Sequence, residues 1–65
     1  MNDETLELLV SKLEDRKKNI VEFLCDGAAK DYAEYRNLCG EFRGLTAAQM
    51  EAKDLVRKLK ELDDE

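Results

Sequence analysis

The sequence predicts an all-α fold: a two-helix antiparallel hairpin with a coiled-coil-like seam and helices over about residues 3–24 and 32–62. Three observations predict it. Apolar residues recur at helical steps of three and four, proline is absent, and a Gly/Ala-rich segment, CDGAAKD, interrupts the pattern at residues 25–31. Two helices joined by so short a connection lie antiparallel.

The first helix is indicated by one apolar stripe of the amphipathic type. Asn2 or Asp3 is expected to cap its start, since short polar side chains accept hydrogen bonds from the free N–H groups there. Gly27 is expected to end it in a left-handed conformation. The stripe consists of Leu6, Leu9, Leu13, Ile20 and Leu24.

The second helix is expected to begin at Tyr32, because Asp31 followed by Glu34 is a capping-box pattern. Acidic residues 63–65 oppose the helix dipole at the far end and are expected to fray. A competing break lies at residues 44–46, where Thr46 would cap a third helix; we expect a continuous helix instead. Its seam is formed by Tyr35, Leu38, Phe42, Leu45, Ala52, Val56 and Leu59, with polar Gln49 at the interrupted position.

Pairing the helices outward from the turn gives the expected alignment of the seam. It places Ile20 near Leu38, Leu13 near Leu45, and Leu6 near Ala52. Apolar residues that this seam cannot all bury, namely Leu8, Val10, Val21 and Phe23, suggest a hairpin with more than one adhesive face.

Four small residues in the second helix, Gly40, Gly44, Ala48 and Ala52, are spaced by four and predict a nearly straight stripe of minimal side chains. A glycine inside a helix costs about 1 kcal/mol relative to alanine. Small residues let another helix approach closely. Two interpretations remain open: a contact face for a partner or another copy, or room for the first helix under Val10 or Lys17.

Composition bounds the function. The 65 residues form a single domain, 1–65, and with 42 % charged and 6 % aromatic residues its core is thin. A net charge of −5 argues against nucleic acid as a partner, and no apolar run is long enough to span a membrane. Without a basic leader, the protein is expected in a reducing cytoplasm, with Cys25 and Cys39 free and partly buried.

No catalytic, cofactor or metal signature is found in the sequence. Histidine is absent, and two cysteines cannot complete a zinc site alone. Cys39 is a nucleophile in principle, but a two-helix hairpin offers no water-excluding cavity, so we expect no enzyme activity and no cofactor. The expected protein interface comprises Tyr32, Tyr35, Leu38, Phe42, Leu45 and the small stripe Gly40, Gly44, Ala48 and Ala52.

Residues 13–45, LEDRKKNIVEFLCDGAAKDYAEYRNLCGEFRGL, resemble a family of small tailed-bacteriophage proteins encoded among the head and portal genes. The shared elements are a charged first helix, a Gly/Ala turn and a Y-x-x-Y-R-x-L-x-G-x-x-x-G-L helix, here Tyr32, Tyr35, Arg36, Leu38, Gly40, Gly44 and Leu45. The resemblance covers about half of the chain. It implies a virion-associated structural protein that docks in many copies on portal, neck or capsid proteins, after synthesis in the host cytoplasm.

Two other functions remain open at this point. One is a small acidic inhibitor of a host enzyme or defence complex, binding through Asp31, Glu34 and Glu41. The other is a homodimeric four-helix bundle with a regulatory role. The three differ in partner: a larger phage structural protein, a host protein, or a second copy of the chain.

Overall fold

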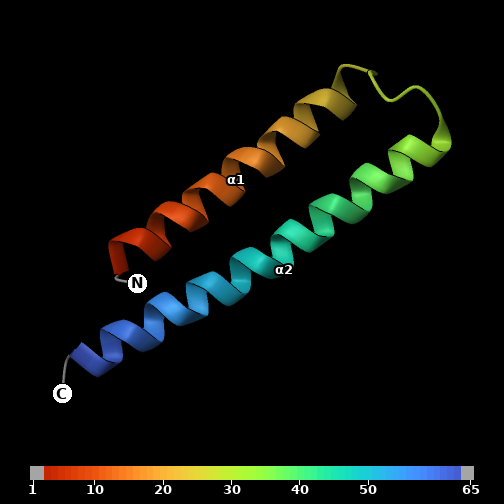
Figure 1. The fold of residues 1–65 in the computed structure, drawn as a ribbon. Coiled ribbons are helices and arrows are strands. Elements are labelled where there is room, and N and C mark those ends of the chain that lie inside the picture. The colour runs from red at the N-terminus through yellow and green to blue at the C-terminus, as the bar shows by residue number, and fades with distance from the viewer. Residues whose placement is uncertain (1–2, 64–65) are drawn as a thin grey trace.

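The computed structural model describes residues 3–63, which form two long helices joined by a short connection. Helix α1 covers Asp3–Cys25 and helix α2 covers Tyr32–Asp63. They lie side by side and antiparallel, as Figure 1 shows, in a rod of 52 × 15 × 15 Å. The helical hairpin predicted from the sequence is confirmed, and each helix ends one residue later than expected.

The connection is built by the local signals that the sequence contains. Gly27 adopts a φ of 71°, and its N–H donates to the Leu24 carbonyl at 3.0 Å. The Ala28 N–H donates to the Phe23 carbonyl at 3.2 Å, which completes a Schellman motif. Asp31 then caps α2, because its Oδ1 accepts a hydrogen bond of 2.8 Å from the Glu34 N–H.

Helix α2 continues without a break through the segment where a third helix was considered. The Thr46 hydroxyl donates to the Phe42 carbonyl at 3.0 Å, so it bonds back to the preceding turn instead of capping a new helix. At the far end, Asp63 still belongs to the helix, which corrects the expectation that it frays; residues 64 and 65 lie outside the described part. Asn2, the alternative cap of α1, lies outside it too.

The seam between the helices is thin. Of the described side chains, only Leu6, Ile20, Ala52 and Gln49 are buried. Leu13, Leu24, Leu38, Phe42 and Leu45 are half-buried along the same contact, while Leu9 is exposed although it belongs to the predicted stripe. Leu9 lies at the edge because the stripe is wider than the strip of α1 that α2 covers.

We expect substitution by alanine to have opposite effects on stability at Gly27 and at Gly44. Gly27→Ala is expected to lower the free energy of unfolding by about 1 kcal/mol, because alanine is strained at positive φ. Gly44→Ala is expected to raise it by up to about 1 kcal/mol, because an added Cβ meets no atom within 4 Å and alanine favours helix. Urea unfolding followed by circular dichroism measures both; a loss of stability in both variants would contradict this.

Candidate protein-interaction site

The two glycines of the predicted small stripe are open to solvent. A Cβ built on either Gly40 or Gly44 has no neighbouring atom within 4 Å. The interpretation that they make room for α1, under Val10 or Lys17, is therefore wrong. The two glycines lower the stability of the helix, and no contact within the hairpin compensates for this loss.

The stripe is not straight, which corrects the prediction. Each four-residue step advances about 40° around a helix, so the series winds by about 120° between Gly40 and Ala52. Gly40, Gly44 and Ala48 are exposed, while Ala52 is buried in the seam at 5 % exposure. Ala52 belongs to the core of the hairpin and is not available to a partner in this arrangement.

The other predicted interface residues divide into two groups. Leu38, Phe42 and Leu45 are half-buried along the seam, so each presents only one edge to the surface. Tyr32 and Tyr35 are 71 % and 46 % exposed and stack on each other with ring centroids 6.1 Å apart. Tyr35 was predicted to lie in the seam; it lies outside it, and a hydrogen bond with the Cys39 side chain raises its pKa above the ordinary value.

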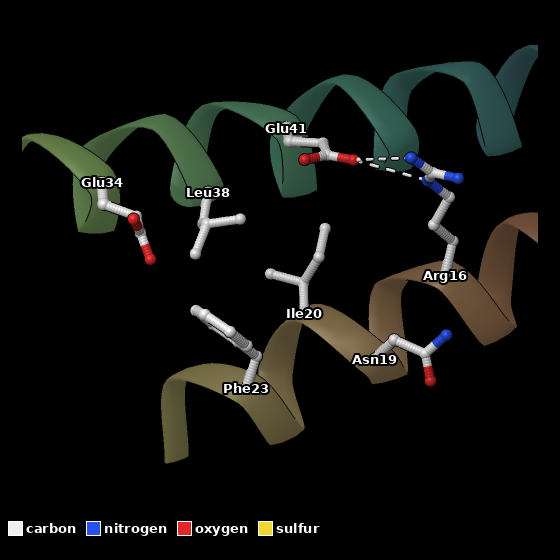
Figure 2. A pocket seen from close by; sticks show the side chains of 7 residues that line it. All are labelled: Arg16, Asn19, Ile20, Phe23, Glu34, Leu38 and Glu41. Atoms are coloured by element: carbon white, nitrogen blue, oxygen red, sulfur yellow. Dashed lines mark hydrogen bonds and ion pairs between the residues drawn. The ribbon is translucent and has the colours of Figure 1, made fainter. Parts of the chain in front are cut away.

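A shallow apolar groove follows one side of the seam near the turn. It measures about 300 Å³, and Ile20, Phe23 and Leu38 form its floor. Figure 2 shows these three side chains pointing into the space between the helices, with Arg16 and Glu41 bridging it at one end. The Arg16 guanidinium lies 3.3 Å from the Glu41 carboxylate, so the groove is apolar with a charged rim.

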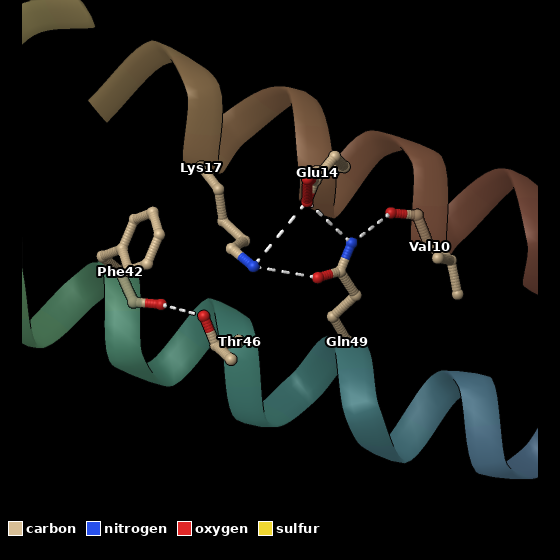
Figure 3. Close-up of polar contacts among 6 residues, drawn as sticks. All are labelled: Val10, Glu14, Lys17, Phe42, Thr46 and Gln49. Atoms are coloured by element: carbon tan, nitrogen blue, oxygen red, sulfur yellow. Dashed lines mark hydrogen bonds and ion pairs between the residues drawn. The ribbon is translucent and has the colours of Figure 1, made fainter. Parts of the chain in front are cut away.

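Gln49 is the one buried polar residue in the described part of the chain. Its amide nitrogen donates to the Glu14 carboxylate at 3.1 Å and to the Val10 carbonyl at 3.3 Å. Its amide oxygen accepts a hydrogen bond of 3.1 Å from the Lys17 ammonium (Figure 3). Lys17 also lies 3.7 Å from the Glu14 carboxylate and 5.0 Å from the centre of the Phe42 ring, a cation–π contact.

This network on the opposite side of the seam was missed at the sequence level. Gln49 appeared there only as a polar interruption of an apolar series. The signal that was available is its place in the seven-residue series 35, 42, 49 and 56, which puts it against α1. Since a buried polar side chain requires partners, that position predicted a network.

The charges proposed for inhibitor binding are engaged within the chain. The Asp31 carboxylate caps α2, Glu34 lies 3.9 Å from the Lys30 ammonium, and Glu41 pairs with Arg16. Near the end of α2, Arg57 and Lys58 lower the pKa of Asp54 and the carboxylate raises that of Arg57. Solvent screens the ion pairs at these exposed sites, so they contribute little to stability.

A loss of stability in acid is expected from the Glu14 carboxylate. The Gln49 hydrogen bond, more than the nearby lysines, lowers the pKa of Glu14 below its ordinary value of 4.5. A lowered folded-state pKa stabilises the fold above the ordinary value, and this contribution is lost as the pH falls through the folded-state pKa. Urea unfolding at pH 6.5 and pH 3, on the order of one to two units to either side of 4.5, should show it.

The matched variants for this measurement are Glu14→Gln and Glu22→Gln, which remove one carboxylate each from α1 about two turns apart. The stability of Glu14→Gln is expected to depend less on pH than that of the wild type. The stability of Glu22→Gln is expected to keep more of the wild-type pH dependence. Equal pH dependence in the two variants would contradict the assignment.

The described residues contain no group of three or more potential metal ligands, and no described helix is long and apolar enough to cross a membrane. Cys25 and Cys39 are free, as predicted, but Cys25 is exposed and only Cys39 is half-buried. No family model, no curated protein and no solved structure matches the chain.

Proposed function

We propose that the hairpin is a non-enzymatic docking protein whose exposed apolar side chains are covered by another protein. One observation supports it most directly: the described part buries three apolar side chains but leaves nine large ones at least 40 % exposed. Apolar side chains that gather in one place, as Phe23 does with Ile20 and Leu38 along the groove, are typical of interaction sites. The nine are Leu8, Leu9, Val21, Phe23, Tyr32, Tyr35, Met50, Leu55 and Leu62.

Gly40 and Gly44 face open solvent in the single chain, so a role for them rests on a partner outside the hairpin. Gly40 and Gly44 each lower helix stability by about 1 kcal/mol, and nothing inside the hairpin requires a missing side chain there. A partner could pack closely against α2 at these two positions, because they carry no side chain. The stacked Tyr32 and Tyr35 rings lie on the same helix and add aromatic surface of the kind that anchors interfaces.

The resemblance of residues 13–45 to small tailed-phage proteins encoded among the head and portal genes suggests a more specific role. The hairpin is then a structural or adaptor protein of a virion, docked in many copies on portal, neck or capsid proteins. Its small size fits this role, because chains below about 70–80 residues usually gain stability from a partner.

Mass spectrometry of purified particles tests the virion assignment, and variants at Gly44 test the docking surface. Gly44→Leu is expected to leave the hairpin helical, since the added side chain meets open space, and to abolish incorporation into particles. Gly44→Ala is the matched control and should be incorporated more readily because it adds only a methyl group. Particles that lack the wild-type protein would contradict the virion role, and full incorporation of Gly44→Leu would contradict this docking surface.

A further inference from the structure

We infer that one face of the hairpin pairs with the same face of a second copy to form an antiparallel four-helix bundle. This deepens the proposed docking function by naming the first partner, and it rests on that function because both use the exposed apolar side chains. We call this surface the bundle face. It consists of Leu9, Arg16 and Phe23 from α1 and Glu41, Ala48 and Leu55 from α2.

The bundle face follows from seven-residue steps. Seven residues make nearly two helical turns, so residues 9, 16 and 23 lie on one side of α1, and residues 41, 48 and 55 on one side of α2. Arg16, Phe23 and Glu41 line the same groove, which shows that the two sides border one face of the hairpin (Figure 2). Leu9, Phe23 and Leu55 are 43 %, 40 % and 50 % exposed on it.

This pattern is that of a bundle helix, not of an isolated two-stranded coil. A two-stranded coil needs two apolar positions in seven, whereas a helix in a bundle adds a third position on one flank. At this third position α1 carries Leu9 and Phe23 with the charged Arg16 between them, and α2 carries Ala48 and Leu55 after the charged Glu34 and Glu41. These residues lie on the same face of the hairpin. The opposite face instead carries the Gln49 network, and its groove is lined mainly by charged residues: Glu14, Lys17, Lys18 and Glu22, with Val21 and Phe42.

Charge favours a second copy as the occupant. At one level of the rod, α1 offers the Arg16 cation and α2 offers the Glu41 carboxylate. A two-fold axis parallel to the rod places α1 of one copy over α2 of the other, so that Arg16 meets Glu41 of the second copy. The alternative is a two-fold axis across the rod at this level, which stacks α1 on α1 of the second copy. It would place Arg16 against Arg16 and Glu41 against Glu41, which is unfavourable.

The available area agrees with a dimer. The 23 residues of α1 are about 35 Å long, and two helices about 10 Å wide give a face of roughly 700 Å². A standard interface uses about 800 Å² on each partner. The single chain exposes 5120 Å², whereas a compact monomer of this 7.5 kDa mass exposes about 4,200 Å². The surface that this chain exposes beyond a compact monomer is similar in size to the area that one such face would bury in a dimer.

Sedimentation equilibrium of the full chain, under reducing conditions and over a range of concentrations, tests the inference. The wild type should reach twice its mass of 7.5 kDa. Leu9→Glu combined with Leu55→Glu should weaken dimerisation by roughly 100-fold, because it buries unpaired charge in the interface. Val21→Glu combined with Met50→Glu is the matched control, because it changes one exposed apolar residue on each helix outside the bundle face, and it should dimerise like the wild type.

Charge exchange tests how the copies are stacked. Arg16→Glu should weaken dimerisation about tenfold, and adding Glu41→Arg should restore it. Circular dichroism confirms that each variant is helical, and Phe23→Glu serves as a second disrupting variant. A monomeric wild type, or equal dimerisation of the Leu9/Leu55 and Val21/Met50 double variants, would overturn the inference; an unchanged Arg16→Glu would overturn the stacking.

The outcomes for the dimer and for the virion role are separate. A monomer in solution that is nevertheless found in purified particles refutes the bundle and leaves the proposed docking function intact. A dimer that no particle contains refutes the virion role and supports the bundle.

Discussion

Ile20→Ala is expected to leave the protein only marginally stable at room temperature. Ile20 is one of three buried apolar side chains in the described part of the chain, at 7 % exposure. Truncating a buried isoleucine to alanine costs about 2–5 kcal/mol. A chain of 65 residues gains only about 3–5 kcal/mol from its core, so this one substitution removes most of the stability.

The matched control is the neighbouring residue. Val21 is 45 % exposed, and Val21→Ala is expected to change the free energy of unfolding by less than about 1 kcal/mol. Urea unfolding of both variants, at one fixed protein concentration and followed by circular dichroism at 222 nm, measures the difference. If Ile20→Ala were no less stable than Val21→Ala, the seam would not be where the structure places it.

The ends of the helices could be predicted because their signals are local. Gly27 stops α1 and Asp31 caps α2 through hydrogen bonds that span no more than five residues of the chain. A short segment of sequence therefore contains both the donor and the acceptor. The same locality explains why the hairpin itself was predictable: the periodic apolar stripes and one short connection leave the helices no other way to cover each other.

The depth of burial along the seam could not be predicted in the same way. Leu9 and Ile20 belong to one predicted stripe, yet only Ile20 is buried. A stripe built of three- and four-residue steps is about 60° wide on α1, and which of its edges is covered depends on how the helices cross. Ala52 shows the converse: its spacing from Gly44 grouped it with an exposed stripe, while the winding of α2 carries it into the seam.

The candidate site was predictable only in part. Gly40, Gly44, Tyr32 and Tyr35 are exposed, but the sequence did not distinguish open glycines from glycines that accommodate α1. The partners of Gln49 lie 32 to 39 residues away, so no local pattern identified them. Such a network becomes visible only when the alignment of the two helices is known.

Gln49 gives the second prediction with a large expected effect, because its two natural replacements should differ in what they lose. Gln49→Ala is expected to lower the free energy of unfolding by about 2 kcal/mol, since it leaves a cavity in the seam and removes the partner of the Lys17 ammonium. Gln49→Leu also removes this partner but fills the space with apolar atoms, so it is expected to lose less stability than Gln49→Ala.

Gln49→Leu is nevertheless expected to lose the unique alignment of the helices. A slide of α1 along α2 by seven residues keeps apolar residues opposite apolar residues, but it separates Gln49 from Glu14 and Val10. With leucine at this position the slid arrangement carries no such penalty, so amide NMR spectra should broaden or show more than one signal per residue.

Met50→Leu is the matched control for this experiment, because Met50 is next to Gln49 in the chain but 66 % exposed, so we expect no effect on the alignment. Its stability and its spectrum should both stay close to those of the wild type. A Gln49→Leu variant with a single sharp set of signals would show that apolar packing alone aligns the helices, and that the buried amide contributes stability without specificity.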